Sequence, residues 1–168
     1  YKGTRKPMPD ELREQVPVMK DVLRAMNVVI VEQAGLEADD ILGTLAKICA
    51  EKGDYCYIAT GDRDSLQLVS NNTSVLLAAT KGGQPVLTEY NVEKIKEEYG
   101  IIPSQLIDVK ALMGDASDNI PGVAGIGQKT ALDLIQKHEN IKNIYDNLES
   151  LPVTENLRNK LSAGKESA

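Results

Sequence analysis

The chain has 168 residues and a formal net charge of −6, and 42% of its residues are hydrophobic and 26% charged. These ordinary globular values exclude a wholly disordered, collagen-like or coiled-coil protein, and no apolar run approaches the roughly 20 residues that span a bilayer. The two cysteines, Cys49 and Cys56, cannot build a disulfide framework or a four-thiolate metal site, so we expect a cytoplasmic protein with no membrane partner.

Helical and β-branched segments alternate in the first half of the chain. In chain order, hydrophobic periodicity predicts a helix at 11–26, a short buried strand at 28–31, a helix at 37–52, a strand at 55–59, a short helix at 64–69, a strand at 74–79 and an extended piece at 85–87. Pro17 is expected to bend the first helix or to break it into two. The alternation predicts an α/β fold with a mainly parallel central sheet flanked by helices.

The second half of the chain is helical throughout. Helices are predicted at 91–99, 103–113, 127–138, 141–148 and 153–161. Glycines follow the first two of these helices directly, at Gly100 and Gly114, where a helix commonly ends.

Three acidic clusters stand out, one near a helix start, one after a strand and one after a helix. They comprise Glu37, Asp39 and Asp40; Asp62 and Asp64; and Asp115 and Asp118. Taken singly, each cluster is also explained by helix capping, the helix dipole or turn chemistry. The second cluster lies beyond the carboxyl end of a strand, where open α/β sheets bind ligands.

Taken together, the clusters predict a metal site for hard cations. They hold seven carboxylates, whereas the whole chain has a single histidine, His138, which we interpret as a surface or packing residue. Ligands that are all carboxylates suit Mg²⁺ or Mn²⁺ and do not suit zinc. Two such ions, roughly 4 Å apart, form the clamp used for in-line displacement at phosphate.

A glycine-rich turn precedes the helix predicted at 127–138. Gly122, Gly125 and Gly127 allow close backbone approach, and exposed N–H groups with a helix N-terminus can bind a phosphate beside Lys129. This pattern predicts a helix-hairpin-helix unit that binds the DNA backbone without reading sequence. A dinucleotide fingerprint is excluded because no strand precedes the glycines and their spacing is wrong. A plain helix connector is the alternative.

In order and spacing, the stretches 37–40, 60–68 and 114–127 resemble the 5′-nuclease domain of bacterial DNA polymerase I, within the flap endonuclease superfamily. The resemblance implies a central mixed sheet with helices on both faces and a helix-three-turn-helix unit. It implies a partial nuclease core in 1–114, with a remnant of the family's basic arch in 1–9, and a helical DNA-binding part in 115–168. The implied activity is hydrolysis of DNA phosphodiesters near 5′ ends or flaps.

The resemblance also implies roles for individual residues. Those matched to the second metal are Asp62, Asp64, Asp115 and Asp118, and those on the first-metal side are Glu37, Asp39 and Asp40. Lys2 and Arg5 match catalytic arch cations near the scissile phosphate. The residues matched to the grip on downstream duplex are Gly122, Val123, Gly125, Ile126, Gly127 and Lys129, and a K⁺ ion is implied at this hairpin.

The chain begins at Tyr1, without the upstream aspartates and strands of the family pattern. We therefore expect a piece of a longer protein that also carries a polymerase part, with impaired cleavage of 5′-flap or nicked duplex DNA. Two alternatives stay open. One is a non-catalytic module that binds DNA structure, and the other is a metal-dependent phosphohydrolase that acts on small phosphates.

Overall fold

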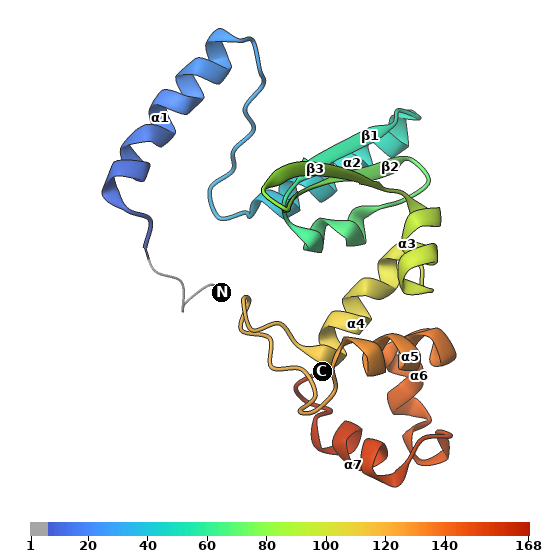
Figure 1. Ribbon diagram of the computed structural model, residues 1–168. Helices are drawn as coiled ribbons and strands as arrows, with labels where there is room; N and C mark the ends of the chain where they lie inside the picture. Colours follow the sequence, from blue (N-terminus) through green and yellow to red (C-terminus); the bar gives the residue numbers. More distant parts are fainter. Residues whose placement is uncertain (1–6) are drawn as a thin grey trace.

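The structure is a computed structural model and describes residues 7–168. The predicted catalytic cations Lys2 and Arg5 lie outside the described residues. Helix α1 (Asp10–Ala25) stands clear of the sheet, and none of its residues is buried (Figure 1). Pro17 lies inside this helix without dividing it.

The strand predicted at Val28–Val31 is wrong. This segment pairs with no strand in the described part of the chain, and Val29 is 85% exposed. The described sheet contains only the strands at 56–60, 73–81 and 84–90. β-branched residues favour a strand mainly through packing and pairing, so their propensity is ineffective where no neighbour lies alongside.

The described sheet has three strands, in the order β1 (Cys56–Thr60), β2 (Thr73–Lys81) and β3 (Gln84–Tyr90). The pair β1–β2 is parallel, as expected, whereas β2–β3 is antiparallel. The reason is the two-residue turn Gly82–Gly83, in which both φ angles are positive, at 56° and 76°. Such turns join neighbouring antiparallel strands. The predicted α/β class is confirmed, with a mixed sheet.

Two helical elements on either side of β1 in the sequence position acidic residues. Helix α2 (Ala38–Lys52) ends at Gly53, in the left-handed conformation, and packs against β1. The 3-10 helix η1 (Arg63–Leu68) follows β1 and buries Ser65 and Leu66. It contacts both β2 and the helical half of the molecule, so it connects the two.

The helical half agrees with the predicted elements. Its members are α3 (Val92–Tyr99), η2 (Pro103–Gln105), α4 (Leu106–Met113), α5 (Gln128–His138), α6 (Ile141–Asp146), η3 (Leu148–Ser150) and α7 (Glu155–Ala163). Side-chain oxygens of Asn91, Asn140 and Thr154 accept backbone N–H bonds and so begin α3, α6 and α7. None of the described helices is both long and apolar enough to cross a membrane.

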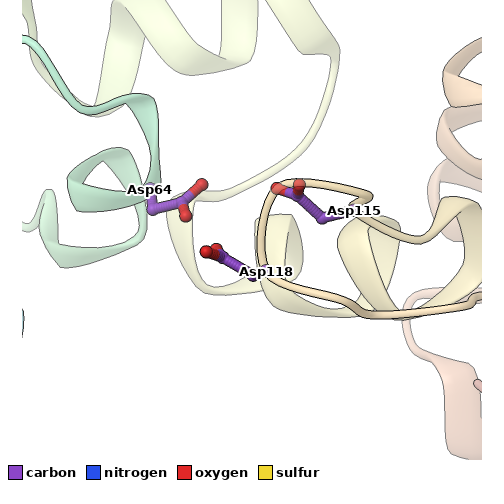
Figure 2. Close-up of side chains that lie close together, drawn as sticks. All are labelled: Asp64, Asp115 and Asp118. Atoms are coloured by element: carbon purple, nitrogen blue, oxygen red, sulfur yellow. The ribbon is translucent and has the colours of Figure 1, made fainter. Parts of the chain in front are cut away.

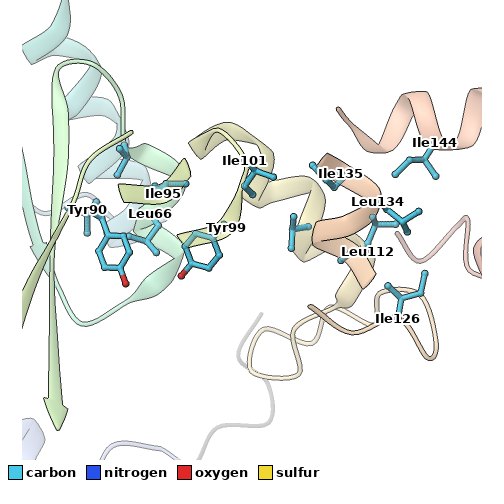
Figure 3. Close-up of a cluster of buried hydrophobic side chains, with 14 of the residues drawn as sticks. Leu66, Tyr90, Ile95, Tyr99, Ile101, Leu112, Ile126, Leu134, Ile135 and Ile144 are labelled. Carbon is cyan, nitrogen blue, oxygen red and sulfur yellow. The ribbon is translucent and has the colours of Figure 1, made fainter. Parts of the chain in front are cut away.

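One hydrophobic core joins the sheet to the helices. Figure 3 shows it running from Leu66 and Tyr90 through Tyr99 to Leu112 and Leu134. Leu112 and Leu134 are 0% and 1% exposed, at the contact between α4 and α5. Because this core is continuous, it holds the loop between α4 and α5 in a definite position relative to η1.

Candidate metal centre and phosphate-binding hairpin

Three aspartates from two parts of the chain form one acidic cluster, which we call the acidic triad: Asp64, Asp115 and Asp118. Asp64 belongs to η1, whereas the other two lie on the loop after α4 (Figure 2). One carboxylate oxygen from each residue lies within 4.8 Å of the others. Within residues 7–168 this is the one group of three or more His, Cys, Asp or Glu side chains that could share an ion.

Local hydrogen bonds hold the triad side chains in place. Asp62 begins η1, and its carboxylate accepts a bond from the N–H of Asp64 at 3.0 Å. The acidic loop, residues 114–120, is closed by two 2.8 Å backbone bonds between Asp115 and Ile120. One oxygen of Asp115 accepts bonds from the N–H and hydroxyl of Ser117, which leaves the second oxygen to face the triad.

Lys110 of α4 lies among the three carboxylates, which the sequence analysis missed. Its Nζ atom is 2.5 Å from Asp64 Oδ2, 2.8 Å from Asp115 Oδ2 and 3.4 Å from Asp118 Oδ2. The available signal was one lysine inside the otherwise apolar last turns of the helix that precedes the acidic loop. That signal is weak, because a helical lysine is ordinarily solvent-exposed.

The ammonium and the carboxylates shift one another's protonation. Lys110, helped by Ser117, holds the pKa of Asp115 well below its usual range. Burial disfavours the charged form of Lys110, but the bonds to Asp115 and Asp64 outweigh burial and raise its pKa. Both groups are therefore charged at neutral pH.

The lowered pKa of Asp115 predicts a pH-dependent stability. The charged form of Asp115 stabilises the fold at any pH above its unfolded value, near 4, and this contribution is lost as the pH falls through the folded value. Denaturant unfolding of the metal-free protein between about pH 7 and pH 2 should show the wild type losing about 2 kcal/mol more than Asp115→Asn. Asp133→Asn, which removes an exposed carboxylate, should follow the wild type. Identical curves for wild type and Asp115→Asn would contradict this.

Asp39 and Asp40, at the start of α2, make different contacts. Asp39 receives a 3.4 Å hydrogen bond from the hydroxyl of Ser65. Burial, and then the negative charge of Asp62, raise the pKa of Asp39, so the first two acidic clusters face each other. The carboxylate of Asp40 instead accepts a 2.9 Å bond from the N–H of Glu37, which is a capping role. None of these acids belongs to the triad.

Two members of the triad border a cavity of about 580 Å³. Asp64, Lys110 and Asp115 line it, together with Arg63 and Tyr99. The volume lies in the usual range for small-molecule sites. The charged wall is therefore accessible to a group that enters from outside.

The glycine hairpin, residues 120–127, has one face built against α4. A Cβ atom on Gly122 would lie 2.3 Å from the backbone nitrogen of Gly114. Val123 and Ile126 are 2% and 3% exposed, and their N–H groups bond to Leu112 and Val123. Gly122, Val123 and Ile126 therefore hold the hairpin in place from its buried side, and their expected role at the DNA stays a prediction.

The other face of the hairpin is exposed. Gly125, Gly127 and Lys129 are accessible, and no side chain caps the start of α5 at Gly127. A Cβ atom on Gly127 would meet nothing within 4 Å. Lys160 of α7 donates a 3.3 Å bond to the carbonyl of Gly125, which adds a second cation that sequence reasoning missed. Uncapped N–H groups beside cations can bind a phosphate.

Comparisons with protein families cover the whole chain. Residues 1–100 match the model of the 5′-3′ exonuclease N-terminal resolvase-like domain, and residues 101–168 match the 5′-3′ exonuclease C-terminal SAM fold. DNA polymerase I of Caldicellulosiruptor bescii is 45% identical over 168 residues, all of this chain and 20% of that protein. A 5′-3′ exonuclease of Buchnera aphidicola subsp. Schizaphis graminum is 44% identical over 151 residues, 90% of this chain and 50% of that protein.

Solved structures agree with the family match. The 5′-exonuclease of bacteriophage T5 with bound divalent ions (zinc) is 29% identical with a TM-score of 0.77, covering 97% of this chain and 59% of that one. The T5 D15 flap endonuclease in a complex with DNA and metal ions is 29% identical with a TM-score of 0.78, covering 99% of this chain and 63% of that one. The chain thus spans about a fifth of its DNA polymerase I relatives, and it belongs to the 5′-3′ exonuclease family.

Proposed function

We propose that this chain supplies a metal-dependent nuclease site that hydrolyses DNA phosphodiesters near 5′ ends or flaps. The observation that carries the proposal is the acidic triad, which is assembled from two distant parts of the chain and has two members, Asp64 and Asp115, on the wall of a 580 Å³ cavity. Residues 1–114 would form the nuclease core and residues 115–168 the DNA-binding part. Structures of the T5 relatives with divalent ions and with DNA support this assignment.

The donor set fits a hard divalent cation such as Mg²⁺ or Mn²⁺. The triad offers only carboxylate oxygens, the ligands these ions prefer, from Asp64, Asp115 and Asp118. An ion held there supplies a Lewis acid for the phosphate oxygens and lowers the pKa of an attacking water. Asp62 orients Asp64 through the N–H bond at the start of η1.

A second ion is proposed on the side of α2, where Asp39 faces Asp62. Burial and the neighbouring charges disfavour the ionised form of Asp39, so a cation placed between these acids would be stabilised by both. Glu37 and Asp40 lie at the same helix start, with Asp40 engaged in the cap. The proposal therefore includes two ions, one at the acidic triad and one between Asp39 and Asp62.

The exposed face of the hairpin would bind the backbone of duplex DNA. Gly125 and Gly127 permit close approach, Lys129 and Lys160 add positive charge, and none of these groups reads a base. The proposed partners are 5′-flap or nicked duplex DNA and the polymerase part of a longer protein, in replication and repair. The K⁺ ion expected at the hairpin stays a prediction.

Cleavage of a 5′-labelled flap duplex tests the proposal. We expect the full chain to release short products with Mg²⁺ or Mn²⁺ and none with excess EDTA. The expectation of impaired activity predicts a slower rate than that of the T5 5′-exonuclease on the same substrate. Duplex binding without cleavage in any divalent ion would contradict the nuclease proposal and favour the binding module.

The hairpin supports duplex binding as a second, separable function. Gly127→Leu should weaken duplex binding about tenfold, because the side chain would occupy the open space above the start of α5. Its unfolding midpoint should stay close to that of the wild type. Fluorescence anisotropy measures the affinity, with Ser104→Leu, an exposed position on η2, as the control.

The salt dependence of binding separates this function from hydrolysis of small phosphates. Duplex affinity should fall steeply between about 50 and 200 mM salt. The slope of log affinity against log salt concentration should be roughly proportional to the number of phosphates neutralised. Unchanged affinity of Gly127→Leu would contradict the hairpin assignment. A salt-independent affinity would favour a small phosphate as the ligand.

A further inference from the structure

Lys110 brings one positive charge into contact with three negative ones. Its Nζ atom lies within 3.4 Å of an oxygen from each member of the acidic triad, and its side chain is only 22% exposed. Within residues 7–168, no other lysine or arginine forms an ion pair with the triad. Arg63, which also lines the cavity, instead contacts Tyr99 and Glu98.

The ammonium matches the triad in number and geometry of bonds. A lysine ammonium has three N–H donors and no acceptor, and here three carboxylates each present an oxygen toward it. Without a cation, three carboxylates this close would repel one another and raise each other's pKa values. Lys110 reduces that repulsion through its ion pairs with all three carboxylates.

A divalent ion shared by the same three oxygens would need the lone pairs that Lys110 uses. An ion coordinated at about 2.1 Å from these oxygens would also lie next to the ammonium, where like charges repel. The two cations therefore exclude each other from the triad. Lys110 lines the cavity, so its flexible side chain has open volume into which the ammonium can move.

We propose that Lys110 is an internal counter-cation of the acidic triad and that a divalent ion binds there only as the Lys110 ammonium leaves the three oxygens. The inference rests on the proposed function, because it takes the triad as an ion site. The displaced ammonium would move away from the triad oxygens into the cavity that Lys110 lines. There the ammonium can attract an anionic phosphate, so binding of the divalent ion also makes the positive charge of Lys110 available to the substrate.

Mn²⁺ binding to Lys110→Met, measured by titration calorimetry, tests the exchange in the full chain. If Lys110 occupies the triad about nine-tenths of the time, its removal should tighten Mn²⁺ binding about tenfold. In EDTA the variant should unfold at a lower temperature than the wild type, because the three carboxylates lose their counter-charge. Saturating Mn²⁺ should remove or reverse that difference.

Lys142→Met is the matched control. Lys142 pairs with Asp146 on the exposed surface of α6 and with no member of the triad, so this substitution removes the same charge outside the triad. Its Mn²⁺ affinity should equal that of the wild type. An equal gain in both variants would mean that net charge alone is responsible and would overturn the exchange.

A second measurement needs only the wild type and keeps the proposal testable if Lys110→Met does not fold. Acylation of lysine amines, followed by peptide mass spectrometry, reports the accessibility of Lys110. Its reactivity should rise several-fold on adding Mn²⁺, with Lys142 as the internal standard. Unchanged reactivity of Lys110 with bound Mn²⁺, or unchanged or weaker Mn²⁺ binding by Lys110→Met, would overturn the exchange alone. Absence of Mn²⁺ binding in both proteins would overturn the metal site and the exchange together.

Discussion

Replacing Asp115 by alanine should reduce metal-dependent cleavage at least about 100-fold, the upper loss seen when only supporting partners of metal ligands are removed. Asp115 supplies one triad oxygen and, through its other oxygen, holds Ser117 and so shapes the acidic loop. Its loss removes a ligand and also leaves Lys110 with fewer negative partners. Asp64 and Asp118 would then keep their ion pairs with the Lys110 ammonium and bind it in place of the metal.

Duplex binding by Asp115→Ala should stay within about twofold of the wild type. The exposed face of the hairpin consists of Gly125, Gly127, Lys129 and Lys160. The Asp115 side chain, which this substitution removes, bonds to none of them, and the backbone bonds between Asp115 and Ile120 are kept. Quenched-flow cleavage of a flap substrate and anisotropy on the same duplex measure the two effects, with Asp133→Ala as the control for an exposed carboxylate. Undiminished cleavage by Asp115→Ala would refute the triad as the metal site.

Replacing Gly122 by alanine should destabilise the protein by about 3 kcal/mol. The added Cβ atom would lie 2.3 Å from the nitrogen of Gly114, and the φ angle of Gly122, +60°, is strained for any residue with a side chain. The left-handed conformation alone costs about 1–2 kcal/mol, and forcing a buried backbone apart typically costs about 1–3 kcal/mol. Gly114 precedes Asp115, so the shift should also weaken divalent-ion binding.

Gly127→Ala is the matched control for this substitution. Gly127 has φ of −101°, which any residue adopts, and its Cβ would point into open space. Because alanine is a poorer N-cap than glycine, the free energy of unfolding should fall by no more than about 1 kcal/mol. Denaturant unfolding monitored by circular dichroism compares the two variants. Equal stability of both would mean that the contact between Gly122 and Gly114 is not required for the fold.

Much of the fold could be predicted from local patterns. Helices α3, α6 and α7 begin where a capping side chain and an apolar repeat coincide, and these features depend on a few adjacent residues. The strand at Val28–Val31 failed because β-branched residues need a neighbouring strand, which periodicity cannot supply. The antiparallel pairing of β3 follows from the turn at Gly82–Gly83, and the resulting mixed sheet agrees with the one that the family resemblance implied.

The candidate site divides in a similar way. Residue chemistry indicated a carboxylate-only metal site and seven candidate acids. The described structure brings three of them together, Asp64, Asp115 and Asp118, whereas Asp40 forms part of a helix cap. The hairpin was predicted as a unit, yet its glycines do different work. Gly122 packs against Gly114, while Gly127 faces open space.

By itself, the sequence determined the type of chemistry, because the ion preference of carboxylates and the conformational range of glycine belong to the residues. It also determined the helices, whose caps and periodicity are local. Only the tertiary structure decided which acids converge. Asp64 comes close to Asp115 because η1 packs against α4, and this packing joins residues as far apart in sequence as Asp64 and Lys110, 46 positions. The same packing put Lys110 inside the triad, a contact set by the shared core and invisible to any local pattern.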